Sequence, residues 1–298
     1  MFSMYKTIDP KDISTRELHG YLLGAVAPRP IAFASTIDSR GNVNLSPFSF
    51  FNVFGSNPPT LIFSPARRVR DNTTKHTLEN VQEVGEVVIN VVNYAMVEQI
   101  SLASTEYPKG VNEFIKAGFT QVPSLKVKPP RVGESPVAFE CKVKQIITTG
   151  EEGGAGNLII CEVVMVHIKE DILDEGGKID QHKIDLVGRL GGLWYVRASG
   201  DALFEVPNPS GTQNIGFDGL PAFLLETDRL TANELAKLAR HEALPPAEQV
   251  KAFAQSEEYR KQLAGKPDEE TIYDLAKQHL RNNEVEKAWL YLLQLNNQ

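Results

Sequence analysis

Two long β-branched segments constrain the fold of this chain more than any other feature of its sequence. Residues 137–149 and 157–168 are rich in Val and Ile, and the glycine-rich segment 150–156 separates them. Such runs on either side of a glycine-rich break predict a long antiparallel ribbon. Further β-branched or aromatic runs indicate four more strands, at residues 31–37, 43–51, 60–64 and 86–92.

Helical patterns are scarce in the first two thirds of the chain. Only residues 77–83 and 96–103 have a pattern that favours a helix. The polar break at 38–42 predicts instead a hairpin between the two strands that flank it. Because strands do not alternate with helices, an antiparallel barrel is favoured over a doubly wound parallel sheet. The sequence also lacks the Gly-x-Gly-x-x-Gly and P-loop motifs, which argues against a Rossmann nucleotide-binding domain.

The last third of the chain has a helical pattern. Thr231 and Glu234 form a predicted capping box, and prolines at 245, 246 and 267 separate further segments, so we expect three or four short helices. A stretch rich in Pro and Gly precedes them and is typical of a linker. The expected organisation is a β domain at residues 1–200, a linker at 201–220 and a helical extension at 221–298.

Composition narrows the range of partners. The chain of 298 residues has 31 Lys and Arg against 38 Asp and Glu, a formal net charge of −7. This balance argues against a nucleic acid partner, because binding to phosphodiester backbones depends on positive charge. No apolar run approaches the roughly 18 residues of a membrane-spanning helix. The start also lacks a basic segment followed by an apolar run. We therefore expect no membrane partner and a cytoplasmic location.

The chain offers no metal-binding pattern. Cys141 and Cys161 lie in predicted strands without a Cys-x-x-Cys spacing, and the six histidines show no ligand spacing. We expect both cysteines to be small buried apolar side chains, and we expect no metal site.

The first candidate for a functional role is the segment Asn44 to Asn52, with the sequence Asn-Leu-Ser-Pro-Phe-Ser-Phe-Phe-Asn. Pro47 cannot donate to a sheet ladder, which confines it to an edge or a bulge. Free backbone groups beside aromatic side chains could contact a planar heterocycle at its edge and on its face. A core strand with a proline kink is the alternative.

The second candidate is the basic segment 64–77, which precedes a predicted helix. It contains three arginines, one lysine and several hydroxyl groups. Arg can bind a phosphate with two hydrogen bonds, and a helix N-terminus favours an anion, so this segment could form a phosphate pocket. A solvated basic loop explains it equally well.

The third candidate is the segment 188–195. Gly191 and Gly192 allow close approach of the backbone, and Tyr195 offers an aromatic face with a polar tip. An ordinary turn is the alternative.

Together these segments resemble the flavin reductase-like family of FMN-binding split barrels, over roughly residues 15 to 200. The likeness rests on several motifs in order: Arg29-Pro-Ile-Ala-Phe-Ala-Ser-Thr36, residues 44–52, Asn57-Pro-Pro59, Phe63-Ser64, Lys75-His-Thr77 followed by Leu78-Glu-Asn80, and Gly188-Arg-Leu-Gly-Gly192 with Tyr195.

The resemblance implies a six-stranded antiparallel split barrel and a homodimer with flavin near the subunit interface. FMN is the implied cofactor, with FAD as the alternative, and NADH or NADPH is the implied hydride donor. Electrons would pass to free flavin or to a partner protein such as a monooxygenase. An FMN-binding electron carrier or flavin store without its own turnover is the alternative function, and a structural dimer that holds no flavin is a third.

The resemblance also implies roles for single residues. Ser35 and Thr36 correspond to flavin-edge contacts. Ser46, Pro47, Phe48 and Ser49 correspond to the segment under the isoalloxazine, and Asn52 ends that motif as a further flavin-binding candidate. The implied phosphate group is Ser64, Arg68, Lys75 and Thr77, with Arg189 and Tyr195 as additional flavin contacts. His76 stands where the family commonly has Asp. No catalytic side chain is expected, because a flavin accepts hydride at its own N5.

Overall fold

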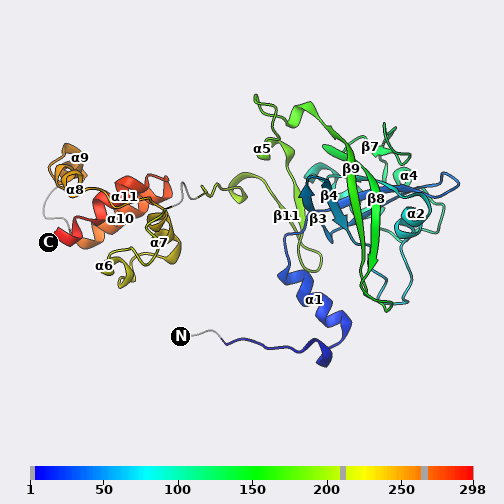
Figure 1. The fold of residues 1–298 in the computed structure, drawn as a ribbon, viewed down its shortest axis with the longest axis horizontal. Helices are drawn as coiled ribbons and strands as arrows, with labels where there is room; N and C mark the ends of the chain where they lie inside the picture. Colours follow the sequence, from blue (N-terminus) through cyan, green and yellow to red (C-terminus); the bar gives the residue numbers. More distant parts are fainter. Residues whose placement is uncertain (1–3, 209–212, 263–267, 298) are drawn as a thin grey trace. The chain divides into compact units, whose positions relative to one another are not determined.

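The computed structural model describes residues 4–208, 213–262 and 268–297 of the chain (Figure 1). The chain forms two units, Met1–Phe204 and Glu205–Gln298. Of the predicted linker 201–220, residues 209–212 lie outside the described residues, as does Pro267. No described helix is long and apolar enough to span a membrane. In the described part of the chain, no group of three His, Cys, Asp or Glu side chains could hold a metal ion.

A seven-stranded antiparallel sheet organises the first unit. Its order is β2-β1-β5-β8-β9-β4-β3. The strands are β1 (Ala32–Ile37), β2 (Val43–Phe48), β3 (Phe51–Ser56), β4 (Pro59–Phe63), β5 (Glu86–Asn90), β8 (Val137–Thr148) and β9 (Asn157–Ile168). The predicted ribbon is confirmed, since β8 and β9 pair along their whole length and are the longest strands (Figure 1). The predicted hairpin of β1 and β2 is also confirmed.

The two edge strands of this sheet, β2 and β3, are consecutive in the chain. Only Ser49 and Phe50 separate them, and three Cα–Cα steps of 3.8 Å span at most about 11 Å. The sheet must therefore curl until its two edges nearly meet, without pairing to close the barrel. The resemblance implied six strands. The structure has seven, because the predicted strand 43–51 ends early as β2 and a further strand, β3, follows at Phe51–Ser56.

Short elements complete the first unit. They are α1 (Thr15–Ala25), α2 (His76–Val84), α3 (Val97–Ala103), α4 (Glu113–Ala117), α5 (Gln181–Ile184), the strand pairs β6 (Gln121–Val122) with β7 (Arg131–Val132) and β10 (Val187–Arg189) with β11 (Tyr195–Arg197), and the 3₁₀ turns Pro10–Asp12, Tyr94–Met96, Glu170–Ile172 and Gly200–Ala202. The predicted helices at 77–83 and 96–103 are confirmed as α2 and α3. Helix α1 was not expected, although Leu18, Tyr21, Leu22 and Ala25 recur at helical spacing. In the structure it buries no residue.

Strand β1 separates two apolar cores. Ala32 and Ala34 face one core, which Leu78 of α2 covers, whereas Phe33 faces the other together with Ile100 of α3 and Phe114 of α4. This alternation is the period of two that a central strand imposes. Both cysteines are buried, free and packed in the first of these cores, as expected. Burial raises the pKa of the Cys161 thiol to about 12, so it stays protonated.

The second unit is helical. Its described helices are α6 (Ala222–Leu225), α7 (Ala232–Ala239), α8 (Ala247–Ala254), α9 (Glu257–Gln262), α10 (Glu269–Arg281) and α11 (Val285–Leu292), followed by the 3₁₀ turn Leu295–Asn297. The six helices exceed the three or four expected, because α6 and α9 are single short turns without a periodic pattern. The capping box of Thr231 and Glu234 is confirmed.

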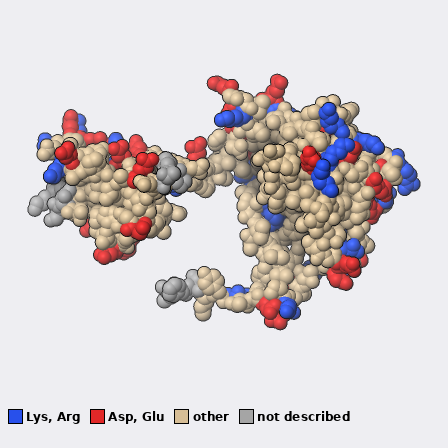
Figure 2. Space-filling model, viewed as in Figure 1, with Lys and Arg blue, Asp and Glu red and all other residues tan. Residues whose placement is uncertain are grey.

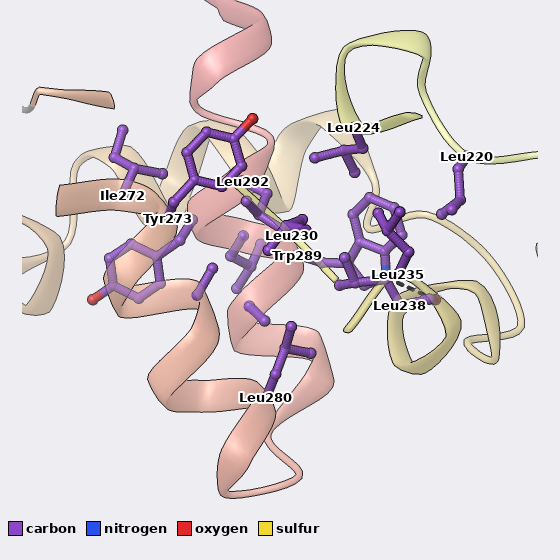
Figure 3. Packing of buried hydrophobic residues seen from close by; sticks show 14 of the residues in the cluster. Leu220, Leu224, Leu230, Leu235, Leu238, Ile272, Tyr273, Leu280, Trp289 and Leu292 are labelled. Atoms are coloured by element: carbon purple, nitrogen blue, oxygen red, sulfur yellow. Dashed lines mark hydrogen bonds between the residues drawn. The ribbon is translucent and has the colours of Figure 1, made fainter. Parts of the chain in front are cut away.

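The second unit has its own apolar core (Figure 3). Trp289 is fully buried, and its indole N–H donates to Leu238 O at 3.3 Å. Part of the predicted linker packs here as well, because the N–H groups of Ile215 and Gly216 donate to the carbonyl groups of His241 and Ala239.

Candidate functional site

Three adjoining cavities run along the end of β2 and form one cleft, here termed the β2 cleft. Their volumes are about 260, 210 and 20 Å³. Residues 47–49 line the two larger cavities, and Ser46 and Lys75 line the largest and the smallest. Ser104, which follows α3, lines all three. The cleft therefore has β2 as a continuous wall.

Pro47 lies on an edge strand, which is one of the two positions predicted for it. It pairs with Phe33 of β1 in a register without a bulge. On its other side β2 has no neighbouring strand, and the Leu45 N–H donates there to Glu113 Oε2 at 2.9 Å. Because backbone groups alternate along a strand, the carbonyl of Pro47 faces the same free edge as the Leu45 N–H. The strand thus turns an acceptor away from β1.

Glu113 was not predicted as part of this region. It is the first residue of α4, it is 5% exposed, and it lines the smallest cavity. Burial raises the pKa of its carboxyl group. Its contact with Leu45 fixes α4 to the edge of β2.

The smallest cavity forms one end of the cleft. Arg68, Arg70 and Lys75, here termed the cationic cluster, lie at this end around the carboxylate of Glu106. Arg68 Nε donates to Glu106 Oε1 at 2.9 Å, and Arg70 Nη2 donates to Glu106 Oε2 at 2.9 Å. Lys75 Nζ lies 3.6 Å from Glu106 Oε1. Arg68, Lys75 and Glu106 all line the smallest cavity, together with Thr77. This end of the β2 cleft is therefore built to hold an anion.

The loop that carries the cationic cluster is fixed by its own hydrogen bonds. Arg68 donates to Thr73 Oγ1 at 2.8 Å and to Thr74 O. The Thr73 N–H donates to Asp71 Oδ1 at 3.1 Å. The turn between β8 and β9 packs against this loop at Gly153, where an added Cβ would lie 3.0 Å from Arg68 O. Only glycine allows that close approach.

The electrostatics of this end follow from its contacts. Hydrogen bonds from Arg68 and Arg70 lower the pKa of Glu106 to about 2, so this carboxylate is ionised at neutral pH. Burial, together with the nearby charge of Arg68, lowers the pKa of Lys75. Burial also lowers the pKa of His76, which leaves this imidazole neutral near pH 7. Elsewhere on the first unit, Figure 2 shows basic and acidic side chains interspersed on the visible face.

The opposite end of the cleft is formed by the segment after β10. The Arg189 guanidinium lies 4.5 Å from the centre of the Tyr195 ring, and Arg189 Nη2 donates to Gly192 O at 2.9 Å. Arg189 and Tyr195 line the 210 Å³ cavity together with residues 47–49. The three sequence candidates therefore meet in one cleft.

Ten of the thirteen predicted site residues line the β2 cleft: Ser46, Pro47, Phe48, Ser49, Ser64, Arg68, Lys75, Thr77, Arg189 and Tyr195. Ser35 and Thr36 do not. Both are fully buried in the central strand β1, where Thr36 Oγ1 accepts a hydrogen bond from Asn80 Nδ2 and Ser35 Oγ has no partner among the described residues. Asn52 also lies away from the cleft walls, exposed on β3, and its Oδ1 accepts from the Val53 N–H.

Arg29 has a positioning role that sequence reasoning did not assign. It is 6% exposed, and its guanidinium donates to the carbonyl groups of Leu23, Val26 and Leu190 and, at 3.4 Å, to Ser49 Oγ. It thereby joins α1, the end of β2 and the segment after β10. The only available signal was its place in the Arg-Pro motif. His19, Leu23, Ser104, Glu106 and Glu113 also line the cleft, and they come from segments with no distinctive pattern.

The sequence model described as "Flavin reductase like domain" matches residues 24–193. This range includes every residue that lines the cleft except His19, Leu23 and Tyr195. The chain belongs to this family. An uncharacterized protein of Aquifex aeolicus is 39% identical over 196 residues, which are 66% of this chain and 97% of the relative.

Two solved structures have folds similar to that of this chain. Component B of nitrilotriacetate monooxygenase from Bacillus cereus has 28% identity and a TM-score of 0.64, and the match covers 69% of this chain and all of that one. A flavin reductase with a split barrel domain from Shewanella frigidimarina has 28% identity and a TM-score of 0.56, covering 66% and 95%. The flavin reductase-like protein thus has the mainly β split-barrel fold with added helices, and its second unit lies beyond the family match.

Proposed function

We propose that this flavin reductase-like chain is an FMN-dependent oxidoreductase that takes hydride from NADH or NADPH and passes electrons to free flavin or to a partner protein. The observation that carries the proposal is the β2 cleft, which joins the Pro47 edge to the cationic cluster. Similarity to component B of a monooxygenase supports a partner protein as one of the electron acceptors.

The residues present fit FMN. The Glu106 carboxylate already lies within 2.9 Å of two arginine nitrogens, so the cationic cluster accommodates an anionic group. Arg68, Lys75 and Thr77 would hold the phosphate, and the edge of β2 would lie along the ring system. FMN is favoured over FAD because FMN ends in a single phosphate, and Arg68 and Lys75 lie together at one end of the cleft.

When bound, FMN supplies the hydride-accepting atom, so the protein needs only to bind and orient it. Phe48 is 8% exposed and gives the cleft an apolar wall. The Pro47 carbonyl, at the free edge of β2, is an acceptor for a ring N–H. Arg189 at the far end supplies positive charge, which would stabilise negative charge on a reduced ring.

An absorption spectrum of the purified full chain and anaerobic stopped-flow mixing with NADH and NADPH test this proposal. We expect a yellow protein, or one that takes up added FMN, whose flavin is bleached by a nicotinamide nucleotide. Binding of FMN without bleaching would favour the electron carrier or flavin store. A chain that neither binds FMN nor oxidises NADH or NADPH would contradict both.

We also propose that the chain is a homodimer. Strand β3 is an edge of the sheet and exposes two large apolar side chains, Val53 at 63% and Phe54 at 64%. Uncovered edges of this kind are normally paired or protected. A monomeric mass in sedimentation equilibrium would argue against this assembly.

A further inference from the structure

Glu106 occupies the centre of the cationic cluster, and the proposed function gives it no role. Its carboxylate contacts Arg68 and Arg70 at 2.9 Å and Lys75 at 3.6 Å. It lines the same small cavity as Thr77. The groups proposed to hold the flavin phosphate are therefore already engaged by a carboxylate of the chain itself.

The two arginines do not depend on Glu106 for their positions. Arg68 also donates to Thr73 Oγ1 and Thr74 O, and Arg70 Nη2 also donates to Asp71 Oδ2 at 3.1 Å. These contacts would hold both guanidinium groups if Glu106 moved away. A role for Glu106 in organising the arginines is thus disfavoured.

The Glu106 side chain has room to leave the cluster. It is 43% exposed, and it belongs to the segment between α3 and α4. The backbone beside it is held independently, because the Tyr107 N–H donates to Thr105 O. Because this side chain already faces solvent, water can hydrate the carboxylate after it rotates out of the cluster.

The charges favour a phosphate over the carboxylate. A phosphate monoester carries about −1.5 to −2 at neutral pH and has three acceptor oxygens, whereas Glu106 carries a single negative charge. With Glu106 in place, one positive charge of the cluster is already neutralised. With Glu106 turned away, Arg68 and Lys75, which line the small cavity, are free to pair with the phosphate, and Arg70 adds positive charge beside them.

We propose that Glu106 competes with the flavin phosphate for the cationic cluster and thereby sets how tightly the chain holds FMN. The inference rests on the proposed function, because it needs the FMN phosphate to bind at this cluster. Glu106 leaves the cations when FMN binds and returns when FMN dissociates. It keeps FMN exchangeable, and it does not affect a flavin that lacks the phosphate.

The test uses the full chain with Glu106→Gln, which keeps the size of the side chain and removes its charge. We expect the dissociation constant of FMN to fall by roughly tenfold, as expected for losing one like charge near the phosphate. The dissociation constant of riboflavin should not change, because riboflavin has no phosphate. Titration calorimetry measures both dissociation constants. Inorganic phosphate alone, titrated into the flavin-free chain, should also bind more tightly to the variant than to the wild type.

Glu79→Gln is the matched control. Glu79 lies on α2 and pairs with Lys109 at 2.7 Å and with Thr74 Oγ1, outside the cationic cluster. The substitution removes the same charge, so equal tightening in both variants would indicate a general charge effect and overturn the inference. Unchanged or weaker FMN binding in Glu106→Gln would also overturn it while leaving the proposed function intact. A wild-type chain that binds no FMN would overturn both.

Discussion

Lys75 is the cation that links two parts of the β2 cleft, because it lines both the largest and the smallest cavity. Burial lowers the pKa of its ammonium group. A partly buried charge of this kind needs an anionic partner, and in this structure Glu106 lies 3.6 Å away. At the residue scale, the cleft therefore combines the positive charge of Lys75, which suits an anion, with the apolar surface of Phe48, which suits a ring.

Replacing Lys75 with Ala should weaken FMN binding about ten- to a hundredfold, because a hydrogen bond to a charged group contributes about 1.5–3 kcal/mol. Riboflavin binding should weaken much less. Fluorescence titration with both flavins measures the difference. Lys109→Ala is the control, since Lys109 pairs with Glu79 outside the cluster. Equal losses for both flavins in Lys75→Ala would reject the phosphate assignment.

Glu113 should make stability depend on pH, because its pKa is raised by burial. The folded chain holds this proton to a higher pH than the unfolded chain does. The associated stabilisation is therefore full at low pH and is lost as pH rises from the ordinary Glu range through the folded pKa. Glu113→Gln cannot ionise, so its free energy of unfolding should improve relative to wild type as pH rises.

Urea unfolding of both proteins at about pH 4 and about pH 8 checks this expectation, because the two pH values lie on either side of a raised carboxyl pKa. A difference between the two proteins that is the same at both pH values would mean that folding leaves the pKa of Glu113 unchanged.

At the scale of elements, the sequence was most informative where side chains repeat. The runs that became β8 and β9 are long, β-branched and interrupted by glycines, so their pairing could be predicted from the printed sequence. Helix α1 was missed, although Leu18, Tyr21 and Leu22 recur at helical spacing after the Ser14 cap. The break of residues 43–51 into two strands was also missed, since it depends on how the edges of the sheet meet.

Part of the candidate site was predictable because some of its residues are unusual for their sequence context. Pro47 breaks a rule for strands, and the arginines of segment 64–77 stand out in an acidic chain, so both attract attention in sequence alone. Glu106 and Glu113 do not, because they come from a segment without a pattern and reach the cleft only through the fold. Ser35 and Thr36 show the converse, since their motif gave no sign that β1 is central and buried.

Pro47→Ala should destabilise the chain by only about 0.4–1 kcal/mol, because the substitution mainly frees the unfolded chain and breaks no ladder bond at a free edge. Proline at Ala34 of the central strand β1 is the contrasting variant, and it should cost about 3 kcal/mol or more or prevent folding. Urea unfolding measures both. A loss for Pro47→Ala as large as that for Ala34→Pro would show that the proline ring stabilises the folded state through its own contacts and not mainly by restricting the unfolded chain.

At the scale of the whole molecule, the chain carries a complete family domain and a second unit that the family match does not include. The helical unit has its own buried core around Trp289 and Leu238. Every residue that lines the β2 cleft lies before residue 196. The cleft residues named above thus all belong to the first unit.

Removing residues 205–298 should leave the dissociation constant of FMN unchanged, because the remaining chain retains every cleft residue. Calorimetric titration of the shortened chain measures this, with circular dichroism as the check that it is folded. Its solubility or its oligomeric state should change instead. Complete loss of flavin from a folded, shortened chain would show that the helical unit builds part of the site.

The two-residue link between β2 and β3 bears on the order in which the β2 cleft forms during folding. The hairpins β1–β2 and β3–β4 are local, but β5, β8 and β9 stand between them in the sheet. Strands β2 and β3 stay close because two residues link them, but the sheet between them is complete only when β5, β8 and β9 have paired with both hairpins. A partly folded chain could thus contain both hairpins and still lack the complete β2 cleft. We therefore expect the ability to bind a ligand to form late and cooperatively during folding.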